Sequence, residues 1–201
     1  MAWRFFTAGG VVRVAAPTIF TNEAARDTAI PAPTEGMRAY LTAPTVPAAT
    51  GVTTAVPLGV QTIYNGFVWV CTTPVGAGSD TDGTSASTSY VSTLTSDTVE
   101  VSVTLVTGTT ARIEYNSTAR SSNDGAELGI SVAVSLATTL AASNNNGALP
   151  QAPGANRDLI SSRSFILTGL TAGTNKFLLS YRTSAGTITY KSRSFIVTGI
   201  A

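Results

Sequence analysis

The sequence contains no histidine, and this absence removes the commonest general base and the commonest transition-metal ligand of proteins. No Ser-His-Asp or Cys-His arrangement can therefore form. A Walker loop, a zinc-ligand spacing and a dinucleotide fingerprint are missing as well. We therefore predict that the protein is not an enzyme and needs no cofactor, and the sequence offers no catalytic, cofactor-binding or metal-binding residue.

Charged residues are scarce, since they make up 11% of the 201 residues and give a formal net charge of +1. An average soluble domain contains about 25%. The sequence thus predicts neither a basic field for nucleic acid nor an acidic field for cations. Ser, Thr, Asn and Gly fill the polar positions instead. Strand faces of this kind suit self-association, because they carry few like charges that repel one another.

Long hydrophobic runs are also absent, because no apolar stretch approaches the roughly 20 residues of a membrane-spanning helix. We therefore expect no membrane span. The N-terminal stretch M-A-W-R-F-F-T-A-G-G-V-V has one arginine and no apolar core long enough for a secretory signal. We expect a protein that is synthesised in a cytoplasm without a signal peptide.

The single cysteine, Cys71, cannot form a disulfide within the chain. It lies in F-V-W-V-C-T, which favours a buried strand thiol, with a reactive thiol as the alternative. This run follows Asn65-Gly66, and Asn-Gly between two β-prone runs is a strong hairpin signal because both turn positions need positive φ angles. We therefore predict a hairpin that pairs residues 61–64 with residues 67–71.

Residues 1–72 are predicted to form a small β-rich module with three or four strands. The run Thr21-Asn22-Glu23, followed by Ala24, Ala25 and Arg26, favours a helix cap and a single helical turn. Strands are expected at Val11, Val12 and Val14 and at 37–42, whereas 43–59 is rich in Pro, Thr, Ala and Gly and is predicted to be loop. Such a module is too small to build a deep core, so we expect it to attach to a neighbour.

Residues 73–89 have almost no large apolar side chain and are predicted to be a flexible Gly/Ser/Thr linker between two domains. An alternative interpretation comes from Asp80, Asp82 and Gly83, which resemble part of a calcium loop. The segment lacks the third oxygen position and the distal glutamate that such a loop needs. The linker interpretation is therefore preferred.

Residues 90–201 are predicted to form an antiparallel β-sandwich of the jelly-roll type, so the fold class is all-β. Residues 98–105 alternate strictly between polar and apolar side chains, and residues 129–136 do the same. Strands with one solvent-exposed face and one buried face imply two antiparallel sheets packed face to face. The predicted strands are 90–95, 98–107, 110–118, 127–136, 160–168, 175–182 and 187–198.

A near-repeat supports the β assignment, since residues 162–170 are S-R-S-F-I-L-T-G-L and residues 192–200 are S-R-S-F-I-V-T-G-I. Each copy has glycine as its next-to-last residue, as is typical of a strand and its turn, and similar hairpins are expected. Arg163 and Arg193 occupy equivalent places in the repeat. We interpret them as members of cross-strand ion pairs or as edge protection, with contacts near a trimer axis as the alternative.

Two carboxylates of the second domain, Glu100 and Glu114, could be neighbours across a hairpin that turns near Gly108. A glycosidase needs such a pair held across a cleft. We interpret both as solvated strand positions next to Arg112 or Arg120, and we infer no hydrolysis from them.

Other segments are candidates for contacts with a partner. Residues 137–158 are predicted to form a long exposed loop, and loops of this length are usually functional. Tyr64 and Trp69 are expected to pack in the hairpin, with stacking on sugar rings as the alternative. Three N-terminal aromatic residues are expected to dock on a partner or on the module's own sheet: Trp3, Phe5 and Phe6.

Two stretches resemble proteins of tailed bacteriophages. Residues 24–42, A-A-R-D-T-A-I-P-A-P-T-E-G-M-R-A-Y-L-T, and residues 60–70, V-Q-T-I-Y-N-G-F-V-W-V, resemble the "RDxAIPxPxEGM…YNGxxW" module of phage minor tail and other virion-surface proteins. The acidic residue usual after the strand is replaced here by Ala43-Pro44, and a longer insert follows. Residues 162–183 resemble the end of jelly-roll heads similar to the C1q and tumour-necrosis-factor folds.

These resemblances imply a non-enzymatic structural protein on the surface of a tailed-phage virion, commonly a homotrimer. It would decorate the capsid or belong to a tail appendage, with other virion proteins, such as the major capsid or tail proteins, as partners. A receptor- or carbohydrate-binding module of the tail, with a host-surface glycan as partner, is the alternative. Residues 1–72 would then serve attachment, and residues 90–201 would form the head.

Overall fold

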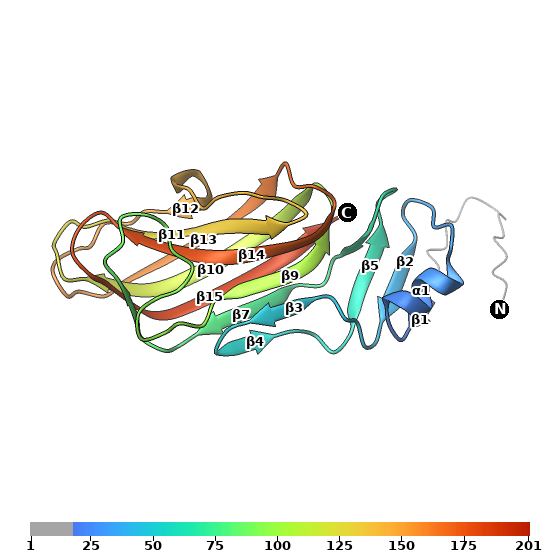
Figure 1. The fold of residues 1–201 in the computed structure, drawn as a ribbon, viewed down its shortest axis with the longest axis horizontal. Helices are drawn as coiled ribbons and strands as arrows, with labels where there is room; N and C mark the ends of the chain where they lie inside the picture. The colour runs from blue at the N-terminus through green and yellow to red at the C-terminus, as the bar shows by residue number, and fades with distance from the viewer. Residues whose placement is uncertain (1–17) are drawn as a thin grey trace, which may run out of the picture.

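The computed structural model of the chain describes residues 18–201. A small sheet with one helix lies at the N-terminal end, and a large two-layered β-sandwich makes up the rest of an elongated molecule (Figure 1). The strand expected at residues 11–14 and the aromatic cluster of Trp3, Phe5 and Phe6 lie outside the described residues.

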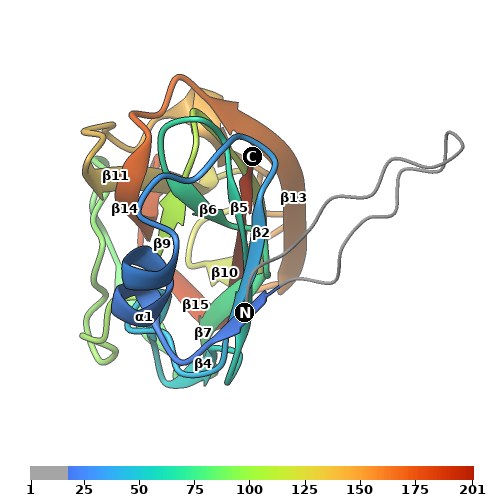
Figure 2. The ribbon, with the colours of Figure 1, turned by 90° about the vertical axis from the view of Figure 1, so that its right-hand side faces the viewer.

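The N-terminal sheet has the strand order β1-β2-β5-β6, and the helix α1 (Glu23–Ala29) packs beside it (Figure 2). The predicted cap is provided by Asn22, whose side chain accepts a hydrogen bond from the Ala25 N–H at 3.0 Å, and the helix of seven residues is longer than the single turn that was predicted. The strands of this sheet are β1 (Thr18–Phe20), β2 (Arg38–Leu41), β5 (Val60–Tyr64) and β6 (Trp69–Cys71).

The predicted hairpin is confirmed, because β5 and β6 pair antiparallel across residues 65–68. Its turn differs from the expected type, since Gly66 has a positive φ of 91° and Asn65 does not. The Asn65 side chain instead accepts hydrogen bonds from the N–H groups of Phe67 and Val68 at 3.1 and 3.0 Å. An asparagine that bonds to the backbone ahead of it stabilises a turn without a left-handed conformation.

The sandwich consists of two antiparallel sheets with the strand orders β13-β10-β15-β7-β4 and β12-β11-β14-β9-β3. A short strand, β8 (Gly83–Ser85), also pairs with β15, and a 3₁₀ turn, η1 (Asn144–Asn146), precedes β12. The other strands are β3 (Ala48–Thr50), β4 (Thr53–Ala55), β7 (Val75–Ser79), β9 (Ser102–Thr107), β10 (Thr110–Ser121), β11 (Leu128–Leu136), β12 (Gly147–Ala148), β13 (Leu159–Thr168), β14 (Gly173–Thr183) and β15 (Ile188–Ile200).

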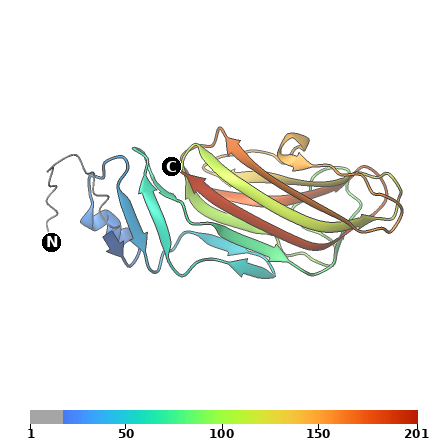
Figure 3. The same cartoon turned by 180° about the vertical axis from the view of Figure 1, so that it is seen from behind.

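The strand order confirms the predicted jelly roll. Apart from the added edge strands, four strands in the order β7-β15-β10-β13 face four in the order β9-β14-β11-β12. Along the chain these strands alternate between the two sheets, except that β11 and β12 are consecutive in one sheet. This double Greek-key arrangement defines a jelly roll, and Figure 3 shows its first sheet with β13 in orange, β10 in yellow-green and β15 in red.

The alternation seen in the sequence places the core between the sheets. Phe177 and Leu179 on β14 lie opposite Val134 and Val132 on β11, and all four are buried. Val99 is 40% exposed, because β9 begins only at Ser102 rather than at the predicted residue 98. The strand predicted at 90–95 is wrong, since in that range only isolated bridges form, at Val91 and Thr95.

The predicted linker at 73–89 is wrong, because this segment contains β7 and β8. All five residues of β7 are buried between β15 and β4. Small residues are required there, since a Cβ on Gly78 would lie 2.7 Å from the backbone oxygen of Arg193. The predicted loop at 43–59 likewise supplies β3 and β4, one to each sheet of the sandwich, so the chain has no physical break at residue 72.

The two copies of the repeat do not form similar hairpins; they are β13 and β15, which flank β10 on its two sides. Their glycines serve different purposes. Gly169 has a φ of +77° and allows the turn after β13. Gly199 does not have a positive φ angle. It is needed because a Cβ at this position would lie 2.5 Å from the backbone oxygen of Cys71 on β6. This contact joins the N-terminal sheet to the sandwich.

We expect Gly199→Ala to destabilise the protein by more than Gly169→Ala. The first substitution forces β6 and β15 apart, whereas the second costs about 1 kcal/mol for its left-handed backbone. Urea unfolding measures the two differences in free energy. Amide hydrogen exchange should also rise in β6 only for Gly199→Ala, and equal exchange in the two variants would contradict this account of the junction.

Candidate functional site

The outward face of the β12-β11-β14-β9-β3 sheet carries a groove of about 540 Å³. Its floor consists of Ala133 on β11 with Leu178 and Ser180 on β14. One wall is residues 89–92, and the opposite wall is residues 141–142. The second wall belongs to the predicted loop 137–158, which the structure folds back against β11 through a bridge between Val134 and Leu140 and through β12.

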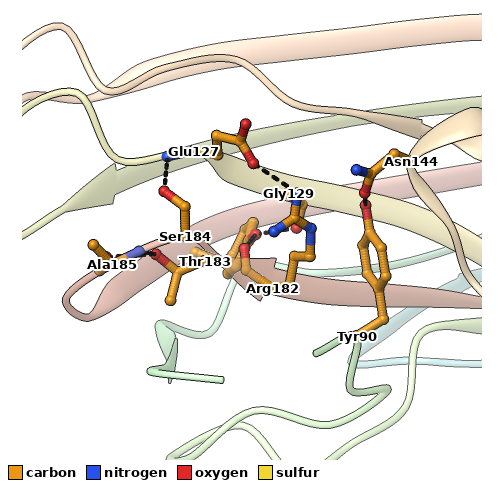
Figure 4. Close-up of polar contacts among 9 residues, drawn as sticks. Tyr90, Glu127, Gly129, Asn144, Arg182, Thr183, Ser184 and Ala185 are labelled. Atoms are coloured by element: carbon orange, nitrogen blue, oxygen red, sulfur yellow. Dashed lines mark hydrogen bonds and ion pairs between the residues drawn. The ribbon is translucent and has the colours of Figure 1, made fainter. Parts of the chain in front are cut away.

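One end of the groove is bounded by a polar cluster (Figure 4). The Tyr90 hydroxyl donates to the Asn144 side-chain oxygen at 3.1 Å and so links the two walls. Beside the Tyr90 ring, the Arg182 guanidinium lies 5.6 Å from the centre of that ring and 2.6 Å from the Glu127 carboxylate. The two charged groups at this end of the groove, Arg182 and Glu127, therefore form an ion pair with each other.

The other end carries a second ion pair, between Lys176 on β14 and Glu100, at 2.7 Å. Lys176 and Arg182 point to the same face of β14, six residues apart, which corresponds to about 20 Å of strand. Between them the lining of the groove has no charged side chain. The groove is thus an uncharged channel whose two flanking ion pairs neutralise themselves.

A second hollow, of about 260 Å³, lies where the N-terminal sheet meets the sandwich. Arg26 from α1 lies in it, 5% exposed, over the Trp69 ring at 4.7 Å and 2.8 Å from Asp27. Trp69 also packs against Tyr64, with ring centres 5.5 Å apart. These contacts support the predicted hairpin packing of Trp69 and leave little of its ring, 8% exposed, for a sugar.

Glu23 anchors this junction. Its carboxylate accepts hydrogen bonds from the N–H groups of Thr45 and Val46 at 3.0–3.1 Å. Burial on its own raises the pKa of Glu23, but these backbone hydrogen bonds outweigh it and bring the pKa below its ordinary value. The hollow is therefore lined by groups that already have partners, and we treat it as a structural junction.

The two equivalent arginines of the repeat have different surroundings. Arg193 is 2% exposed and forms an ion pair with Asp97 inside the sandwich, and Asp97 also accepts from Ser79 at 2.6 Å. Arg163 is half-buried, donates to the backbone oxygen of Gly147 and lies over the Phe165 ring. Arg193 thus forms an ion pair, but not the cross-strand surface pair that was predicted, because the pair is internal and Asp97 lies in the segment between β8 and β9.

The remaining sequence candidates are separated by the fold. Glu100 and Glu114 are not neighbours, because Glu100 pairs with Lys176 on one sheet and Glu114 pairs with Arg112 on the other. Burial raises the pKa of the Cys71 thiol to about 11, in agreement with a buried strand thiol.

Asp80 and Asp82 lie exposed between β7 and β8. Within residues 18–201, no three side chains of the metal-ligating types come together as a metal site. Among these same residues, no helix has the length and apolar character needed to cross a membrane.

Sequence reasoning missed the groove because its parts are far apart in the chain. Tyr90 and Asn144 are 54 residues apart, and neither belongs to a motif. The only available signal was the interruption of strand periodicity at 137–158, which predicted a contact-making loop without predicting what it faces. The fold alone brings this loop to the same sheet face as Tyr90.

Comparison with known proteins gives fold likeness only. No family model matches the chain, and no curated protein matches it. The VP2 protein of infectious bursal disease virus is similar at a TM-score of 0.39 and 13% identity, over 70% of this chain and 41% of that one. Isomalto-dextranase of Arthrobacter globiformis T6 is similar at a TM-score of 0.30 and 11% identity, over 81% and 33%.

The C-terminal CBM6 module of LamC from Zobellia galactanivorans is similar at a TM-score of 0.26 and 13% identity, over 60% of this chain and 90% of that one. The chain spans 41% of the length of the viral protein above. At these scores the likenesses decide nothing about function. The strand order itself defines the class: this is an all-β protein with a jelly-roll sandwich, an architecture that also occurs in viral capsid and lectin domains.

Proposed function

We propose that this chain is a non-enzymatic structural protein on the exterior of a tailed-phage virion, assembled as a homotrimer that decorates the capsid or a tail appendage. The N-terminal sheet attaches the protein to another virion protein, and the jelly roll projects from it. The observation that carries the proposal is the motif A-R-D-T-A-I-P…Y-N-G-F-V-W, whose Arg26 and Trp69 stack on each other.

The attachment role is supported by apolar side chains exposed at the N-terminal end. Phe67 at the tip of the β5–β6 hairpin is 82% exposed, Ile19 on β1 is 68% exposed and Leu58 is 92% exposed. The N-terminal sheet lies at one end of the long axis, beyond the sandwich (Figure 1). Large apolar side chains that are exposed on the module at one end of a molecule are suited to bury themselves against a partner.

Contacts between copies are supported by the outward face of the β13-β10-β15-β7-β4 sheet. Ile160 and Ile166 on β13 are 75% and 51% exposed, and Ile196 on β15 is 37% exposed. β13 is also the last strand of its sheet, with ten residues and no proline to block further pairing. The outward residues of β13 are uncharged: Ile160, Ser162, Ser164, Ile166 and Thr168.

The virion location is tested by immunogold electron microscopy of purified phage particles with antibodies against this chain. We expect regular labelling on the outside of intact particles, either over the head or at the tail. Protein found in the infected-cell lysate but missing from purified particles would contradict the proposal.

The assembly is tested by light scattering of the purified protein. We expect a mass about three times the 20.6 kDa of one chain. The variant Ile160→Lys/Ile166→Lys places two charges on the outward face of β13 and should reduce the mass to that of a monomer. Val99→Lys, at an exposed valine elsewhere, is the matched control and should leave the mass unchanged. A wild-type monomer contradicts the homotrimer.

A further inference from the structure

We propose that the groove above β11 and β14 binds a neutral oligosaccharide. This site is separate from the assembly proposed above, because it lies on the opposite sheet of the sandwich from β13. The floor of the groove lies on the paired strands β11 and β14. Its two walls are joined to each other by the hydrogen bond between Tyr90 and Asn144. The site is therefore formed before any ligand arrives.

The polar groups of the groove point to a ligand rich in hydroxyl groups. Ser89, Ser92 and Ser180 line it, and within residues 18–201 their side-chain hydroxyls have no hydrogen-bond partner. Ser180 is only 4% exposed, yet its hydroxyl is not sealed in the interior, because it faces the groove. A hydroxyl both donates and accepts, so three of them match the mixed donors and acceptors of a sugar.

The absence of charge in the lining points to a neutral ligand. The charged groups nearest the groove, Arg182 and Lys176, are each paired with a glutamate at 2.6 and 2.7 Å. An anionic or cationic ligand would have to break one of these pairs to find a counter-charge. A neutral sugar needs none.

The apolar part of the lining suits the faces of sugar rings. Leu178 and Ala133 form an apolar strip on the floor, and the alanines at 141 and 142 keep one wall low, so a ring can approach the sheet closely. Binding sites of this type combine a mostly apolar surface with a few placed polar groups. Since the groove follows β14 between two ion pairs about 20 Å apart, a short oligosaccharide fits its length.

The experiment is isothermal titration of the full chain with a panel of neutral oligosaccharides of glucose, galactose, mannose and N-acetylglucosamine, and with uronic-acid oligosaccharides as the charged arm. We expect at least one neutral oligosaccharide to bind and the charged ones to bind more weakly. The variant Ser92→Ala/Ser180→Ala should weaken binding about tenfold or more, because two hydrogen bonds to the ligand are lost.

Two further variants make the result specific to the groove. Ala142→Trp fills it from the wall and should abolish binding, with an unchanged circular dichroism spectrum. Ser162→Ala removes an exposed strand serine from the opposite sheet and should leave binding unchanged. The proposal is overturned if no neutral oligosaccharide binds, if the uronic acids bind best, or if Ala142→Trp binds as well as the wild type. Ile160→Lys/Ile166→Lys should keep sugar binding, so failure of the assembly and failure of this site are distinguishable.

Discussion

Replacing Arg193 by Met should lower the free energy of unfolding by about 3–5 kcal/mol, one of the two largest effects we expect from a single substitution in this chain. Arg193 is 2% exposed and its partner Asp97 is 4% exposed, so the substitution leaves a carboxylate in the interior without its counter-charge. The arginine also donates to the backbone oxygen of Thr81 at 2.8 Å and holds the segment after β7 against β15. Chemical denaturation measures the loss.

The repeat provides a matched control for this prediction. Arg163→Met removes the equivalent arginine from β13, where it makes one backbone hydrogen bond and a contact with Phe165, and should cost about 1 kcal/mol. The double variant Arg193→Met/Asp97→Asn removes both buried charges and should recover at least part of the lost stability. Equal losses for Arg193→Met and Arg163→Met would show that the internal ion pair is unimportant.

The same ion pair predicts a loss of stability in acid. Burial raises the pKa of Asp97, but the hydrogen bond from Ser79 and the charge and hydrogen bond of Arg193 outweigh it, so the pKa lies below its ordinary value. The stabilisation is therefore complete above the unfolded-state pKa of about 3.9 and is lost as the pH falls through the lower folded-state value. In Asp97→Asn this part of the acid dependence should disappear.

Replacing Phe177 by Ala should cost about 3–5 kcal/mol and is the second large effect. Phe177 has no exposed surface and pairs with Val134 and Val103 on the two neighbouring strands, so the sheet cannot collapse easily onto the space it leaves. Thermal or urea unfolding checks the value.

Phe67→Ala is the control for Phe177→Ala, because it makes the same substitution at an exposed position. Its ring is 82% exposed at the tip of the β5–β6 hairpin, so its removal should change the free energy of unfolding by less than about 0.5 kcal/mol. If the attachment proposal is correct, Phe67→Ala should still reduce incorporation of the protein into particles. A folded variant with normal incorporation would count against a role of Phe67 in attachment.

Strand periodicity predicted most of the sandwich correctly. The alternation at 129–136 predicted Ile130, Val132, Val134 and Leu136 to point inward. The first three are buried, whereas Leu136 is 61% exposed, because it ends β11 with a positive φ of 79°. The Asn65-Gly66 pair placed the N-terminal hairpin. These predictions succeeded because each depends on local features: the two-residue period of a strand and the conformations a turn residue allows.

The strands that were missed at 43–59 and 73–89 share one physical cause. V-G-A-G-S was predicted to be part of a flexible linker because it lacks large side chains, yet β7 needs small residues to fit between β15 and β4. A strand that is stabilised by backbone hydrogen bonds between two close neighbouring strands needs small residues, so its sequence lacks the alternating large apolar residues by which strands are predicted. The prediction of a loop at 43–59 was wrong for the same reason. β3 and β4 are short edge strands, which form only because they pair with β9 and β7 of the sandwich.

By itself the sequence determined that the chain is an all-β protein without histidine chemistry, with alternating strands for a core and few charges on its surface. Tertiary structure alone decided which of two identical S-R-S-F-I motifs buries its arginine, since Arg193 meets Asp97 and Arg163 does not. It also decided that Tyr90, Ala142 and Ser180 line one groove. The reason is that burial and shared surfaces depend on neighbours supplied by distant strands, and a local pattern contains no information about them.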